Sequence, residues 1–156
     1  MRNYWLLVAV SVLGGLLQAQ AVKQSAAPPG SERERLIGAW HLVSLGEVGP
    51  DGKLSSVAGL KGTLIYTRDG HMSVQIMYPE SAAELTNDYV LNGYEASFGS
   101  YDLDETAHTV THHVQGSITH DLVGQSLTRR YQLSGRRLTI RSVRADERWM
   151  VVWEHD

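Results

Sequence analysis

The sequence predicts an all-β domain, an up-and-down antiparallel β-barrel of eight or nine short strands with one short helix. Runs rich in Val, Ile, Thr and aromatic residues recur along the chain, and turns containing Gly, Asp or Asn separate them. Most links are short enough for consecutive strands to pair as hairpins, and closing such a meander removes the exposed edges of an open sheet. A two-sheet sandwich is the main structural alternative, which periodicity alone does not separate from a barrel.

The expected strands cover residues 39–46, 53–57, 62–67, 71–77, 94–103, 109–115, 125–133, 137–143 and 148–154. The strongest turn signal is Arg68-Asp69-Gly70, because Gly accepts the positive φ that tight hairpin turns require. The helix is expected over residues 82–92. Ser81 and Glu84 fit a capping box before it, and Asn92-Gly93 can end it.

The N-terminus has the pattern of an export signal. Arg2 precedes an uncharged apolar run, and Ala19-Gln20-Ala21 fits a small-x-small cleavage site. An uncleaved anchor is the alternative, but polar and Gly residues from Gly14 to Gln20 weaken the span. We therefore expect a signal peptide over residues 1–21, a polar flexible leader over 22–34 and the barrel domain over 35–156. The protein is then periplasmic or secreted, without stable membrane insertion after cleavage.

Composition excludes several classes of function. The chain has no cysteine, so neither disulfides nor thiol chemistry contribute. A net charge of −3 gives no basic footprint for nucleic acid. No P-loop, G-x-G-x-x-G or G-x-S-x-G motif occurs, and no cofactor is expected.

Six segments in order resemble the bacterial and fungal lipocalin-like domain family. They are Leu36–Ser44, Leu64–Gln75, Phe98–Glu105, Thr109–Ser117, Val123–Gln125 and Arg129–Tyr131. The resemblance covers residues 36 to 154 and implies a lipocalin-type calyx. It also implies that Gly38 lets the chain bend into the barrel floor, that Trp40 closes this end, and that Arg130 or Arg141 packs over the Trp40 ring.

Four histidines, His108, His112, His113 and His120, suggest a metal site, but strand geometry argues against one. His108 and His112 would lie about 13 Å apart along a strand. His112 and His113 would point to opposite faces. We therefore expect no metal site and one inward-facing imidazole. Val110 and Val114 share a face with His112, which favours His112, although a purely structural histidine fits the pattern equally well.

Further polar side chains are candidates for the barrel interior. Together with His112, the candidate ligand-binding residues are Tyr66, Ser73, Gln75, Tyr101 and Arg130. A calyx for an apolar ligand needs a few such donors and acceptors in an apolar lining. Ser73 and Gln75 share one face of their strand and Met72, Val74 and Ile76 the other, so outward-facing positions for Ser73 and Gln75 remain an equal alternative.

Three functions follow from these patterns. The first is a binding protein that holds a small apolar molecule in the barrel. The second is a barrel enzyme, a cyclase or isomerase that moves a proton with His112 or His113 and Tyr101. The third is a filled barrel that serves as a protein interaction module, because an eight-stranded barrel can be just filled by its own side chains. Cavity volume separates the third function from the first two.

Overall fold

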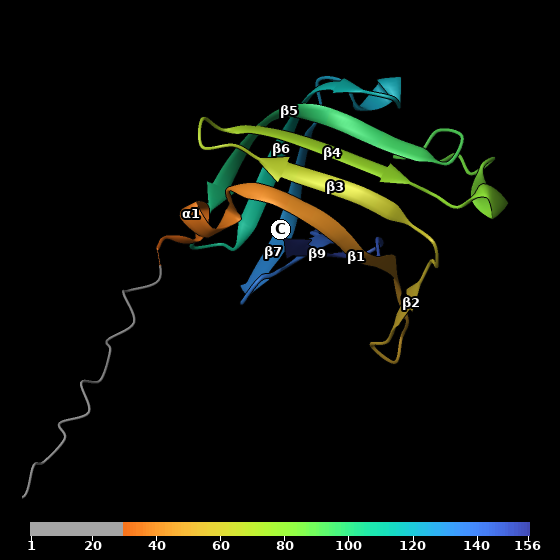
Figure 1. Cartoon of the computed structure of the whole chain (residues 1–156), viewed down its shortest axis with the longest axis horizontal. Coiled ribbons are helices and arrows are strands. Elements are labelled where there is room, and N and C mark those ends of the chain that lie inside the picture. Colours follow the sequence, from red (N-terminus) through yellow and green to blue (C-terminus); the bar gives the residue numbers. More distant parts are fainter. Residues whose placement is uncertain (1–29) are drawn as a thin grey trace, which may run out of the picture.

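The structure is a computed structural model that describes residues 30–156. Nine strands form one antiparallel sheet in the order β2-β1-β3-β4-β5-β6-β7-β8-β9, and β1 also pairs with β9. Eight strands thus close a barrel, and β2 is an extra strand paired with the end of β1 (Figure 1). The strands are β1 Gly38–Val48, β2 Leu54–Ser56, β3 Lys61–Tyr66, β4 His71–Met77, β5 Tyr94–Asp104, β6 Thr109–Ser117, β7 Ser126–Ser134, β8 Arg137–Ser142 and β9 Trp149–His155.

The predicted strands and their meander order are confirmed. The hairpin of β3 and β4 turns at Arg68-Asp69-Gly70, where Thr67 N–H donates to the His71 carbonyl and Gly70 has a φ of 88°. A barrel rather than a sandwich results because the first and last barrel strands pair over most of their length, from Trp40 opposite His155 to Glu47 opposite Trp149. This closure leaves the short β2 as the extra edge of the sheet.

The prediction of a helix over residues 82–92 is wrong. This segment contains a single 3₁₀ turn, η1 Glu80–Ala82, followed by irregular turns. Asn87 explains the difference, because its side-chain Oδ1 accepts from the backbone N–H groups of Tyr89 and Val90. Such local side-chain bonds compete with helical hydrogen bonding. The loop from residue 78 to residue 93 instead buries Val90 and folds over one end of the barrel.

A short helix does occur, at α1 Glu32–Leu36, before the first strand. Ser31 caps it by accepting from Glu34 N–H, and the Glu105 carboxylate accepts from the backbone N–H groups of Glu32 and Arg33. Leu36 is fully buried and belongs to the hydrophobic core. The domain boundary expected at residue 35 falls inside α1. The expected signal peptide and the leader through residue 29 lie outside the described residues.

Trp40 closes the end of the barrel next to α1, as the family resemblance implied. It is 1% exposed, and its indole N–H donates to the Leu36 carbonyl over 2.9 Å. The expected arginine over its ring is a wrong prediction. Arg130 and Arg141 pair across strands on the outer face, and His155 lies edge-on to Trp40 instead, with ring centroids 4.7 Å apart. Gly38 leaves the space that His155 occupies, because a Cβ at this position would overlap the imidazole. Its φ of 135° also favours glycine.

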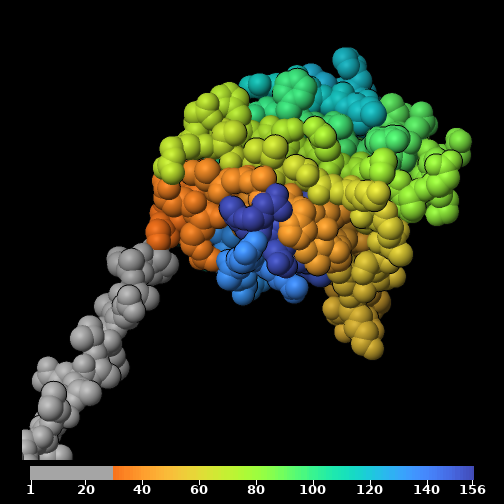
Figure 2. Space-filling view, viewed as in Figure 1, coloured from red at the N-terminus to blue at the C-terminus, as the bar shows by residue number. Residues whose placement is uncertain are grey.

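The two ends of the barrel differ. α1 lies at one end, whereas η1, the loop that follows it and the β2 hairpin lie at the other (Figure 1). The hairpin projects from the body of the domain in the space-filling view (Figure 2). None of the helices described for residues 30–156 has the length and apolar character needed to cross a membrane.

Candidate functional site

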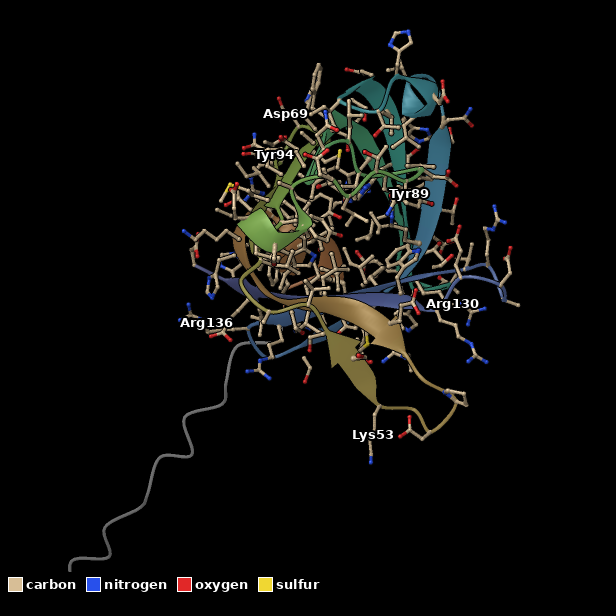
Figure 3. The ribbon with its side chains drawn as sticks, turned by 90° about the vertical axis from the view of Figure 1, so that its right-hand side faces the viewer. Lys53, Asp69, Tyr89, Tyr94, Arg130 and Arg136 are labelled. Carbon is tan, nitrogen blue, oxygen red and sulfur yellow. The ribbon has the colours of Figure 1, made fainter. Side chains whose placement is uncertain are left out.

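A cavity of about 320 Å³ occupies the barrel at the end opposite α1. Exposed residues Glu47, Val57 and Asn87 belong to its lining, so the cavity reaches the surface there. Its walls are mainly apolar side chains of the barrel strands, among them Leu45, Leu64, Val74, Ile76, Ile140 and Val151. Four aromatic residues complete these walls: Tyr78, Tyr89, Trp149 and Trp153. Figure 3 shows Tyr89 within the outline of the barrel.

Strand alternation decides which polar residues reach this cavity. On β6, His112 lies between Val110 and Val114 on the inner face and is 5% exposed. The neighbouring His113 points outward, where its imidazole bonds with Asp102 at 2.8 Å and with Ser126 at 2.9 Å. The prediction that the two histidines face opposite sides is confirmed, and His112 is the inward one.

His112 is held by hydrogen bonds at both ring nitrogens. Arg129 Nη1 lies 3.2 Å from Nδ1, and the Tyr66 hydroxyl lies 2.6 Å from Nε2. Burial, reinforced by the positive charge of Arg129 and by His113, lowers the pKa of His112 well below its usual value, so the ring is neutral. Arginine can only donate, so Nδ1 must accept and Nε2 must carry the proton. The Tyr66 hydroxyl therefore accepts from Nε2–H.

Arg129 reaches the cavity from β7. Its neighbours on the same face of the strand are Leu127 and Tyr131, and it is half-buried. Nη1 makes two hydrogen bonds, to His112 and to the Leu127 carbonyl. The guanidinium also lies 6.0 Å from the ring centroid of Tyr89 and 5.8 Å from that of Trp149, within cation–π range. No Asp or Glu among residues 30–156 forms a salt bridge with Arg129.

Glu95 is the cavity residue whose pKa is closest to that expected of a general acid or base at neutral pH. It stands opposite the inward Ile76 on the neighbouring strand and lines the cavity. Burial raises the pKa of Glu95 to about 7, and the positive charge of Arg129 partly offsets that rise. The carboxyl is therefore able to gain or lose a proton near neutral pH.

The predicted ligand-binding residues are distributed unevenly. His112 lines the cavity, and Tyr66 lies behind it, 1% exposed. Tyr101 is buried against Tyr66, with ring centroids 4.7 Å apart, and its hydroxyl donates to the Thr67 carbonyl. Neither tyrosine is part of the cavity lining.

Three candidates for the interior, Ser73, Gln75 and Arg130, lie on the outer face of the barrel. For Ser73 and Gln75 this is the alternative that the sequence left open, and for Arg130 the interior position is wrong. Met72, Val74 and Ile76 are the buried residues of β4, so Ser73 and Gln75 lie on its outer face. Arg130 follows Arg129 on β7 and is exposed, at the periphery of the barrel in Figure 3. In each case the alternation of the strand determines the side, because alternate residues point to opposite faces. When the apolar residues are buried, the residues between them face outward.

The sequence analysis missed Arg129, Glu95 and the aromatic residues Tyr89, Trp149 and Trp153. The signal for Arg129 was present, because Leu127, Tyr131 and Leu133 alternate with polar residues and place position 129 on the apolar face. Glu95 gave no such signal, since it follows a loop and its face depends on the pairing with Ile76. The indole N–H of Trp153 is buried without a hydrogen-bond partner among residues 30–156.

The enzyme hypothesis loses its predicted residues. His113 lies on the outer face, and the Tyr101 hydroxyl donates to a backbone carbonyl. Both ring nitrogens of His112 form hydrogen bonds within the protein. Within the described part of the chain, no group of three His, Cys, Asp or Glu side chains has the geometry to hold a metal ion.

A closed eight-stranded up-and-down barrel with a cavity at one end is an architecture typical of lipocalins. The sequence profile of the lipocalin-like domain family matches residues 37–154, and the chain belongs to this family. Among solved structures, a lipocalin-like protein from Bacteroides uniformis is similar at 14% identity and a TM-score of 0.48, over 78% of this chain and 99% of that one. The wild-type fluorescent protein UnaG is similar at 10% identity and a TM-score of 0.42, over 79% of this chain and 98% of that one. No curated protein matches the chain in sequence.

Proposed function

We propose that the chain is an exported binding protein that holds a small, mostly apolar molecule in the barrel cavity. The observation that carries this proposal is the cavity itself. Its volume of about 320 Å³ falls at the lower end of the range typical of small-molecule sites, about 300–1,000 Å³. Its lining has the expected composition, an apolar wall with a few polar groups. The same cavity weighs against a barrel filled by its own side chains.

Binding of the neutral dye Nile red tests this proposal. We expect enhanced fluorescence with micromolar or better affinity, which corresponds to about 8 kcal/mol. Val74→Phe narrows the cavity from its wall and should weaken binding at least tenfold. Gln75→Leu changes the next residue on the outer face of the same strand and should leave the affinity unchanged. A folded protein that binds no apolar probe, or variants that behave alike, would contradict the proposal.

Export is supported by the charged start, the apolar run and the Ala19-Gln20-Ala21 pattern. The expected mature N-terminus is Val22, and the intact mass of protein recovered from its native compartment measures it. A membrane-bound chain that retains Met1 would overturn this part of the proposal without touching ligand binding.

A proton-transferring isomerase is the second candidate, and Glu95 favours it. A carboxyl whose pKa is raised to about 7 inside an apolar cavity suits general acid–base chemistry at neutral pH. If the protein is such an enzyme, a bound ligand is converted, and Glu95→Gln abolishes turnover while retaining binding. Recovery of the ligand unchanged after incubation argues for the binding protein.

A further inference from the structure

We propose that the ligand of this cavity carries a carboxylate, which the guanidinium of Arg129 binds. The proposal rests on the binding function above and adds the chemical class of the ligand. It starts from a cation that lines an apolar cavity and forms no salt bridge within residues 30–156.

The unused donors of Arg129 are the first argument. Both of its hydrogen bonds come from Nη1, which leaves Nη2 and Nε without a partner among residues 30–156. Arginine does not lose its proton in proteins, so the charge cannot be relieved by deprotonation. A planar guanidinium with two free nitrogens matches the two oxygens of a carboxylate.

The aromatic rings beside Arg129 are the second argument. The guanidinium lies 6.0 Å from the ring centroid of Tyr89 and 5.8 Å from that of Trp149, and both residues line the cavity. These contacts hold the guanidinium at the cavity wall but do not neutralise its charge. A ligand carboxylate would supply the missing negative charge.

The other polar groups of the cavity are compatible with an anion. His112 is neutral and its two nitrogens are occupied. Glu95 is the group that could compete as a counter-ion, but burial raises its pKa to about 7, so it is mostly uncharged below that pH. Glu47 is exposed at the rim. A cationic ligand group would meet the like charge of Arg129, and at pH 6 Glu95 is mostly uncharged and offers it little compensation.

Three probes that share one alkyl chain test the proposal: decanoate, decanamide and decylammonium. Each displaces Nile red at pH 6, and the affinity is measured from the loss of fluorescence. We expect decanoate to bind about 10- to 100-fold more tightly than decanamide, which is the range for a hydrogen bond to a charged group. Decylammonium should bind least tightly.

Neighbouring arginines supply matched variants. Arg129→Gln should remove the advantage of decanoate over decanamide, whereas Arg130→Gln on the outer face should leave it within about twofold. Should Arg129→Gln fail to fold, Arg129→Lys keeps the charge without the planar fork and is expected to retain the order of the probes with a smaller advantage for decanoate.

The outcomes separate this inference from the proposed function. Equal affinities for the three probes would overturn the carboxylate while leaving the binding function intact. The same holds if Arg129→Gln and Arg130→Gln have equal effects. Failure of Nile red and all three probes to bind the folded protein would overturn both.

Discussion

His112 and His113 are adjacent and identical in chemistry, and so are Arg129 and Arg130, yet each pair divides between two surroundings. The inner residues bond with each other, and their chain of donors runs from Arg129 through His112 to Tyr66. The outer histidine bonds with Asp102, whose side chain is 80% exposed, and with Ser126. The difference teaches that strand alternation, not residue type, assigns these side chains to the cavity or to solvent.

The same difference separates what each face can do. On the inner face water is largely excluded, so hydrogen bonds and charges act at low dielectric and each unpaired group matters. On the outer face solvent screens Asp102 and His113 and replaces any bond that is lost. Substitutions at neighbouring positions should therefore differ in their cost, and three predictions test how far this contrast holds.

The largest expected effect concerns the two histidines. His112→Ala leaves the Tyr66 hydroxyl buried without its partner and opens space beside the cavity, which should lower the free energy of unfolding by about 2–4 kcal/mol. His113→Ala should cost less than about 1 kcal/mol, because its partners are solvated. Urea denaturation measures both. Equal losses would contradict the assignment of His112 to the inner face.

The strands and the inward position of His112 could be predicted from the sequence. The loop after η1 and the cavity could not, for physical reasons. The Asp-Gly turn and the alternating runs predicted the strands, and Val110 and Val114 predicted that His112 faces inward. The helix over residues 82–92 failed because Asn87 satisfies backbone N–H groups locally. The volume of the cavity depends on side chains from several strands and on how the loop from residue 78 to residue 93 packs against them. The pattern of a single strand does not contain this information.

An intermediate effect is expected at Glu95, and it depends on pH. The pKa of Glu95 is about 7 in the folded protein against a usual value of 4.5, so the folded state binds more protons between these values. Stability from this group is therefore lost as the pH rises from about 4.5 through 7. Glu95→Gln should be more stable than the wild type at pH 8, on the order of 1–2 kcal/mol, and similar at pH 4.

The measurement is the difference in urea midpoint between variant and wild type across pH. This difference removes the other titrations, including that of His112, whose lowered pKa makes stability fall as the pH drops below about 6.5. The remaining charged or titratable groups of the cavity lining are Glu47, Tyr78, Tyr89 and Arg129. Glu84→Gln, in the exposed part of the loop, is the control. A difference that does not change with pH would show that the pKa of Glu95 is not raised in the folded protein.

The smallest expected effect is at Ser126, although its surroundings resemble a catalytic arrangement. Ser126, His113 and Asp102 form a hydrogen-bonded Ser–His–Asp chain across three neighbouring strands. A serine hydrolase also needs donors aimed at the developing oxyanion and a site that excludes water. The His113 side chain is 39% exposed, and the three residues lie outside the cavity lining. We therefore expect Ser126→Ala to change the free energy of unfolding by less than about 0.5 kcal/mol and to leave Nile red affinity unchanged. Hydrolysis of an activated ester by the wild type, lost in Ser126→Ala, would show instead that the outer face is functional and that the contrast between the faces is incomplete.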